Sequence, residues 1–337
     1  MFRVEIKEET NLKTFLSLND SEYIDAILDK NKSTFINSTR EIFATITLET
    51  IAIDEVESKS IRLPRKHLLN LLAIGYLLID VRETNVSLDF YEIQKESIVE
   101  KTCGMKFARQ QIWAEGYLDK LQLITGLSID VVYDLSNLND LIKIGNTHKS
   151  IITCDNGVAC VIIDSNCRVY RKIDDTILFS MGANTLSILT RISNKVFNYQ
   201  NYLGVIKDNL TIICTKVRHS SNEDYNLIVQ EKSSFKARID MRYLQRFLSK
   251  IKVSSDTVQV GLEAQNSVIE DGSKLYDIPV MVKDLQKSDV CKECKFNVSV
   301  KILDIVDKIL KHNIVNLSNK RTFVQLDSDE TSIIFRG

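Results

Sequence analysis

Three basic residues of the sequence lie four positions apart, with no acidic residue between them. They are Arg242, Arg246 and Lys250, in the stretch FKARIDMRYLQRFLSKIKVSSDTVQV. Apolar residues of the same stretch recur at i, i+3, i+4 and i+7, which predicts an amphipathic helix over about 240–252 between two strands. A row of cations without acids on one helix face can bind an anion such as a nucleic-acid backbone.

Cys291 and Cys294 form a second group with possible chemistry, in the motif CKEC. A structural zinc ion needs four ligands, usually from two such pairs, and the sequence has no second CxxC. His312 is the only histidine nearby in the sequence. We therefore expect no metal and no cofactor, and we expect these two residues to be free thiols in a polar loop.

The other ionisable residues do not form a recognisable catalytic pattern. The four histidines have no nucleophile or acid at a familiar spacing, and Asp174 and Asp175 lie at a predicted turn, where Asp is favoured for backbone reasons. The sequence contains no GxGxxG, HExxH, GxSxG or GxxxxGK[ST] motif. We expect a protein that is not an enzyme; an enzyme whose site residues are scattered along the sequence is the weaker alternative.

Length and composition limit the class of protein. A chain of 337 residues with 44% hydrophobic and 26% charged residues is typical of a globular protein of two or three domains. No apolar run approaches the roughly 20 residues of a membrane span, and no signal peptide is recognised, so we expect a cytoplasmic protein without membrane contact. The net charge is −1, so any nucleic-acid surface must gather its cations on one face.

Short amphipathic helices alternate with strand-like runs along the whole chain, which predicts an α+β fold. Residues 94–111 are predicted to be a linker, and residues 141–144 a strand. The six predicted helices cover about 11–18, 64–75, 115–126, 183–195, 240–252 and 299–312.

The predicted helices recur at intervals of 50 to 68 residues. Such a repeat indicates successive units of similar architecture. Pairing the units predicts three domains, at residues 1–105, 106–222 and 223–337.

Charge is distributed unevenly between the predicted helices and the rest of the chain. The helices carry many more Lys and Arg than Asp and Glu, although the whole chain has a net charge of −1. A solvated helix face normally carries both signs, so the excess favours an anion-binding surface. Lys-rich solvated helices are also common, and both interpretations stay open at this point.

With this arrangement the whole chain resembles the DNA sliding clamps, the ring-shaped processivity factors of replicative polymerases, in their bacterial or phage three-domain form. Local likeness lies in YLDKLQLITGLSIDVVYDL, in FKARIDMRYLQRFLSKIKVSSDTVQVGL and in FNVSVKILDIVDKIL. The resemblance implies a DNA-clamp fold of three consecutive clamp domains, each with two short helices packed on antiparallel sheet. The 94–111 linker and the C-terminal SIIFRG depart from the family pattern.

The resemblance also implies a site and a set of partners. The helices would line a hole around double-stranded DNA, with contacts to phosphates that do not depend on sequence. A DNA polymerase and a clamp loader would bind through short peptides, and a second copy would complete a homodimeric ring, in a bacterium or a phage-infected cell. The residues that would face DNA are Lys13, Arg65, Lys66, Lys120, Arg191, Lys195, Arg242, Arg246, Lys250, Lys301, Lys308 and Lys311.

By the same resemblance, partner peptides would bind where the second domain meets the third. Ile333, Ile334 and Phe335 are the candidates for that pocket, and the alternative is that they are core residues of the last strand. The alternative function is a clamp-fold scaffold or transcription coactivator that binds proteins without closing a ring.

Overall fold

The structure is a computed structural model of the 337-residue chain. Its described part forms two compact units, the first made of Met1–Asp134 with Ile188–Thr215 and the second of Leu135–Ser187 with Lys216–Gly337. The structure describes residues 1–7, 9–18, 20–53, 57–69, 74–94, 98–110, 112, 117–126, 131–218, 230–240, 255–263, 267–278, 282–286, 293–310, 314–320 and 323–336.

The first unit is built on one antiparallel sheet of twelve described strands. Its backbone follows the order β8-β7-β6-β1-β4-β16-β15-β14-β9, and β2, β3 and β5 complete it beside β4. The strands are β1 (Phe2–Ile6), β2 (Tyr23–Leu28), β3 (Lys32–Ser38), β4 (Ile42–Ala52), β5 (Lys59–Pro64), β6 (Gly75–Val81), β7 (Asn85–Gln94), β8 (Ile98–Ala108), β9 (Val132–Asp134), β14 (Lys195–Tyr199), β15 (Tyr202–Lys207) and β16 (Leu210–Thr215).

Strand β4 joins parts of this sheet that are distant in the sequence. Its C-terminal part pairs with β1, with Val4 opposite Thr50, and its N-terminal part pairs with β16, with Cys214 opposite Ile42. Side chains alternate along a strand, so Phe43 and Glu49 point to one face while Ile46 points to the other. The two faces of this sheet are therefore continuous across the β4–β16 pair.

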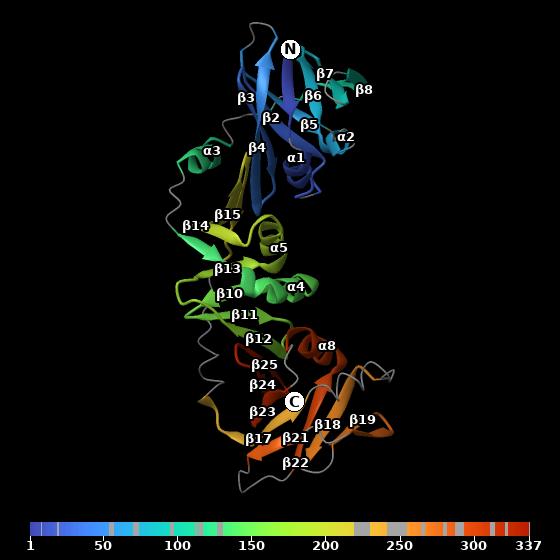
Figure 1. Cartoon of the computed structure of the whole chain (residues 1–337), viewed down its shortest axis with the longest axis vertical. Coiled ribbons are helices and arrows are strands. Elements are labelled where there is room, and N and C mark those ends of the chain that lie inside the picture. Colours follow the sequence, from blue (N-terminus) through green and yellow to red (C-terminus); the bar gives the residue numbers. More distant parts are fainter. Residues whose placement is uncertain are drawn as a thin grey trace. The chain divides into compact units, whose positions relative to one another are not determined.

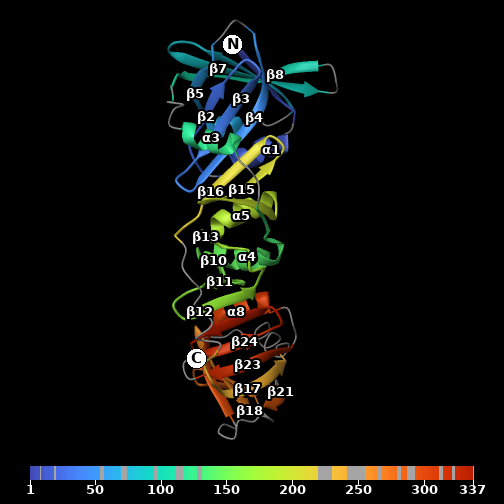
Figure 2. The ribbon, with the colours of Figure 1, turned by 90° about the vertical axis from the view of Figure 1, so that its left-hand side faces the viewer.

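The helices of the first unit lie on both faces of its sheet. Helix α1 (Glu9–Leu16) contacts β4 and α2 (Arg65–Leu69), and α2 contacts β2 and β5. Helix α3 (Leu118–Thr125) lies on the opposite side of β4, to its left in Figure 1 and in front of the strands in Figure 2. Helix α5 (Ala183–Ile192) reaches the first unit with its last residues, Ile188–Ile192.

The second unit contains two antiparallel sheets, of nine and four described strands. The larger one has the order β13-β10-β11-β12-β25-β24-β23-β17-β21, and the smaller one β20-β19-β18-β22. The strands are β10 (Ile151–Asp155), β11 (Val158–Ile162), β12 (Cys167–Lys172), β13 (Phe179–Gly182), β17 (Ser233–Asp240), β18 (Thr257–Glu263), β19 (Ser267–Asp271), β20 (Lys274–Ile278), β21 (Val282–Gln286), β22 (Glu293–Ser299), β23 (Ile314–Lys320), β24 (Val324–Asp327) and β25 (Thr331–Phe335).

Two helices of the second unit contact each other. Helix α4 (Asn139–Thr147) follows a short 3₁₀ turn, η2 (Ser136–Leu138), and packs on β10 and β11. Helix α8 (Val300–Ile309) contacts α4 and β22, and Figure 1 shows the two side by side. Ser299 caps α8 by accepting a hydrogen bond from the Ile302 amide at 3.2 Å, which satisfies one of the free amides of its first turn.

The α+β class predicted from the sequence is confirmed, and two local predictions are wrong. Residues 141–144 lie in helix α4 and not in a strand. The helical pattern is present, because Leu138, Leu141, Ile142 and Gly145 are buried at i, i+3, i+4 and i+7. Short apolar runs do not distinguish a buried helix from a strand, and here the four-residue run hid the longer period.

The second wrong prediction is the linker at 94–111. Most of that segment is strand β8, which pairs with β7 from Ile98 opposite Gln94 to Ala108 opposite Asn85. β8 is an edge strand, and the edge strands of soluble proteins are commonly polar. That polarity hid the alternation of half-buried Met105 and Phe107 with exposed neighbours.

Candidate nucleic-acid interface

A hollow of about 360 Å³ lies in the first unit between α1, the end of α5 and the β15–β16 turn. We call it the basic hollow. One wall is α1, the other is the end of α5, and the turn closes it from below. Its lining residues are Thr10, Asn11, Lys13, Thr14, Ser17, Leu18, Ile188, Arg191, Ile192, Lys207 and Leu210.

Three exposed cations surround the basic hollow, and no acidic residue lines it. They are Lys13 on α1, Arg191 on α5 and Lys207 at the end of β15. Within the described part of the chain, none of the three forms an ion pair. Their charges therefore add to a positive potential at one place on the helix-bearing face of the sheet.

Helix α2 carries one exposed and one buried cation. Lys66 is exposed, in line with its predicted place at a DNA-facing surface. Arg65 is only 8% exposed, and its Nη1 donates a hydrogen bond to the Leu16 carbonyl at 2.7 Å. That carbonyl ends α1, so Arg65 caps a helix C-terminus and its guanidinium points into the protein.

In the second unit, exposed lysines stand on α4 and α8. Lys301 and Lys308 lie on α8, and Lys308 pairs with Asp304 one turn earlier at 2.6 Å. Lys143 is exposed on α4 and was not among the predicted residues, because its segment was predicted to be a strand. A helical interpretation of residues 138–145 would have placed Lys143 on the outer side of that helix.

Two further predicted cations lie away from these helices. Lys120 is on α3, the helix on the opposite side of β4 from α1, with its Nζ 5.1 Å from the centre of the Phe43 ring. Lys195 begins strand β14 and is exposed. Arg242, Arg246, Lys250 and Lys311 lie outside the described residues.

The predicted partner-peptide residues lie in the core of the second unit. Ile333, Ile334 and Phe335 are at most 3% exposed and belong to β25, which pairs with both β12 and β24. The Phe335 ring lies 5.9 Å from the ring of Phe296, and Ile334 packs with Cys160 and Tyr170. The chain in this form does not present these side chains to a partner.

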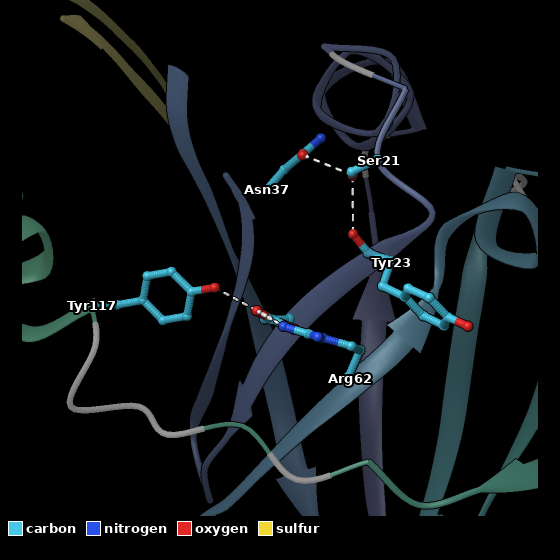
Figure 3. Close-up of polar contacts among 6 residues, drawn as sticks. Ser21, Tyr23, Asn37, Arg62 and Tyr117 are labelled. Carbon is cyan, nitrogen blue, oxygen red and sulfur yellow. Dashed lines mark hydrogen bonds and ion pairs between the residues drawn. The ribbon is translucent and has the colours of Figure 1, made fainter. Parts of the chain in front are cut away.

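A polar clasp holds α3 on the face of the first unit opposite α1. The Tyr117 hydroxyl donates to Asp25 Oδ2 at 2.5 Å, and Arg62 donates to both Asp25 oxygens at 2.7 and 3.2 Å (Figure 3). Burial and this hydrogen bond raise the pKa of Tyr117 to about 12. Figure 3 also shows the nearby Ser21 hydroxyl donating to the Tyr23 carbonyl at 3.0 Å.

Apolar side chains complete the attachment of α3. Leu121, Leu123 and Ile124 pack over a buried cluster that includes Phe43 of β4 and Ile213 of β16. The helix therefore covers the strand pair that joins residues 42–46 to residues 210–214.

A second hollow of the first unit, of about 530 Å³, differs from the basic hollow in its charges. We call it the paired hollow. Lys7 forms ion pairs with Glu49 and Glu5, which raise the pKa of Lys7 and lower that of Glu49. Its lining residues are Glu5, Lys7, Lys32, Thr47, Leu48, Glu49, Asp208, Asn209 and Thr211.

Neither a metal site nor a membrane helix is found among the described residues. No three His, Cys, Asp or Glu side chains there are placed to share a metal ion. Cys294 is buried and accepts a hydrogen bond from Asn319 Nδ2 at 3.2 Å, and Cys291 lies outside the described residues. No helix in the described ranges is long and apolar enough to cross a membrane.

The chain was compared with known proteins at the level of sequence and of structure. No family model matches the sequence, and neither does any curated protein. A putative DNA polymerase III beta subunit from Eubacterium rectale matches in structure with a TM-score of 0.71 and 12% identity, over 100% of this chain and 99% of that one.

Two further crystal structures match over almost the full length of both chains. The DNA polymerase sliding clamp of Pseudomonas aeruginosa has a TM-score of 0.68 and 11% identity, covering 100% of this chain and 99% of that one. The beta clamp of Helicobacter pylori bound to a DNA ligase peptide has a TM-score of 0.66 and 13% identity, covering 99% and 98%. At this identity the likeness shows the fold, and the clamp fold predicted from the sequence is confirmed.

Proposed function

We propose that this chain, which has the fold of the bacterial sliding clamps, is itself a DNA sliding clamp. Two copies close head to tail into a ring around duplex DNA, and the ring tethers a replicative polymerase. The observation that carries the proposal is the placement of the cations. In both units exposed Lys and Arg side chains stand on the helices that pack on the sheets, and the basic hollow contains no acid.

The proposed DNA-facing set follows from that placement. It keeps the exposed residues of the described helices, adds Lys143, and leaves out Arg65 because it is buried and Lys120 because α3 lies on the other face. Arg242, Arg246, Lys250 and Lys311 stay in the set as predictions from the sequence. The members from the described helices are Lys13, Lys66, Lys143, Arg191, Lys301 and Lys308.

Three clamp domains per chain, at 1–105, 106–222 and 223–337, give six in the proposed ring. Two strand pairs support this division. Residues 42–46 of the first domain pair with 210–214 of the second, and residues 167–171 of the second pair with 331–335 of the third. On this division each domain shares a continuous sheet with the next, which would make the chain stiff enough to close around DNA.

The mechanism needs no chemical step by this chain. Lys and Arg contacts to phosphates are weak, independent of sequence and dependent on salt, so the ring slides while its closed topology keeps it on DNA. A separate ATPase must open the ring, because the sequence lacks a P-loop motif. The Helicobacter pylori clamp is bound to a DNA ligase peptide, and we propose that short peptides of a polymerase and a loader bind this chain in the cytoplasm.

Solution mass is the first test of the ring. One chain is 38.5 kDa, and light scattering over a dilution series should give twice that mass at every concentration. Duplex DNA binding should weaken steeply with salt. A mass of one chain, together with no binding to duplex DNA, would refute the proposal and favour a clamp-fold scaffold that binds only proteins.

A further inference from the structure

The lining of the basic hollow is divided into a polar and an aliphatic side. On α1, Thr10, Thr14 and Ser17 recur at i, i+4 and i+7, beside the exposed Lys13. On α5, half-buried Ile188 and Ile192 recur at i and i+4, above the buried Leu18 and Leu210. A ligand that fills this hollow must be anionic on one side and apolar on the other.

The cations indicate that the anionic side is phosphate. One peptide carboxylate is neutralised by one cation, whereas Lys13, Arg191 and Lys207 together match two consecutive phosphates of a nucleic-acid strand. The exposed hydroxyl of Thr10 and the partly exposed hydroxyl of Thr14 can add neutral donors to the phosphate oxygens.

The aliphatic side distinguishes a single strand from a duplex. In a duplex the base faces are stacked on one another, so a duplex that slides past offers only phosphates and sugars to these helices. An unpaired base has a free apolar face, and burying it against Ile188 and Ile192 removes apolar surface from water. A purely electrostatic sliding surface would have no use for an aliphatic wall of this kind.

The hollow is also held in shape by its own residues. The Asn11 side chain donates to the Asn209 side chain at 3.1 Å, which ties α1 to the β15–β16 turn. Asp208 in that turn has a φ of 54°, a left-handed conformation that fits a tight turn, and its side chain lines the paired hollow. Lys207 is thereby kept at a defined distance from Lys13, and a preorganised site spends less of its binding energy on ordering.

We propose that the basic hollow binds an unpaired nucleotide of a DNA strand, with its phosphates on Lys13, Arg191 and Lys207 and its base on Ile188 and Ile192. The inference rests on the proposed function, because it assumes that the helix-bearing face meets DNA. It adds that this face prefers DNA with a single-stranded segment, such as the junction where a new strand is being extended.

The test uses fluorescence anisotropy of the full chain with labelled 12-nucleotide oligo-dT and, separately, a 12-base-pair duplex at low salt. The double variant Ile188→Gln, Ile192→Gln should bind oligo-dT about three- to tenfold more weakly, because it loses apolar burial, and bind the duplex within about twofold of the parent. The matched variant Ile188→Val, Ile192→Val keeps the aliphatic wall and should bind oligo-dT like the parent. Thermal melting checks that each variant is folded.

Three results would overturn the inference, and they are separable from a failure of the clamp. If the Gln variant binds oligo-dT as tightly as the parent, or if both variants lose affinity equally, the aliphatic wall holds no base, while duplex binding and ring mass still support the clamp. If the parent binds the duplex but not oligo-dT, the hollow is not a single-strand site. If the parent binds neither, both proposals fail.

Discussion

The two faces of the first unit use charge in opposite ways, although both are built on the same strands. On the face with α1, the basic hollow gathers three cations and no acid. On the face with α3, the paired hollow holds Lys7 between Glu5 and Glu49, and Asp25 holds Arg62 and Tyr117. Residues of the β15–β16 turn line both hollows, so the two lie on either side of a single turn.

The difference shows how a chain with a net charge of −1 can carry an anion-binding surface. Charges that are paired within the protein have little attraction left for a ligand, whereas unpaired charges of one sign add up. The α3 face therefore repels or ignores DNA and is held by internal contacts. The α1 face keeps its cations free for a partner.

The largest expected effect is the loss of DNA binding when charge is reversed on the α1 face. The double variant Lys13→Glu, Arg191→Glu should weaken duplex binding about 100-fold at low salt and flatten the salt dependence by about two phosphate contacts. Filter binding across a salt series measures both quantities.

The matched control for that variant is Lys7→Glu, Lys32→Glu, which reverses two lysines of the paired hollow. It should change duplex affinity by less than about threefold, because those charges lie on the other face and Lys7 is already paired. Equal losses in the two double variants would mean that only the net charge matters and that the faces do not differ.

A smaller effect is expected on stability, on the α3 face. Asp25→Ala removes a carboxylate that is 7% exposed and leaves Arg62 and Tyr117 without their partner. We expect a loss of about 2 to 3 kcal/mol in the free energy of unfolding, measured by urea titration. Glu49→Ala, at an exposed ion pair, should cost less than about 0.5 kcal/mol. An equal cost for the two would contradict the clasp.

The smallest expected effect is a pH dependence of the same clasp. The pKa of Tyr117 is raised to about 12 in the folded chain, from about 10 when unfolded, so the neutral hydroxyl is the form that stabilises the fold. That contribution is complete below about pH 10 and is lost as the pH rises toward 12. Tyr117→Phe should therefore be less stable than the parent at pH 8 by about 1 kcal/mol, and the gap should narrow by pH 11.

Urea midpoints of both proteins at pH 8 and pH 11 measure this gap. A gap that stays constant between the two pH values would mean that the hydroxyl does not act through Asp25. A gap that widens at high pH would reverse the assigned sign.

Local periodicity allowed much of the fold to be predicted from the sequence. The alternation in residues 2–6 and the helical spacing in residues 299–312 correspond to β1 and α8 because a buried face imposes a period on a single segment. The α+β class, the recurring helix units and the likeness to clamps follow from such patterns. The excess of cations on helices could also be predicted, and Lys13, Lys66 and Arg191 are exposed there.

Other features were decided only by tertiary structure, because they depend on segments that are far apart in the sequence. Arg65 resembles Lys66 in sequence, but it is buried because its neighbour in space is the end of α1. Lys207 joins Lys13 only because β16 pairs with β4 and brings a turn beneath α1. Side-chain type and spacing determine which residues can bind an anion, and strand pairing over long sequence distances determines which of them share one surface.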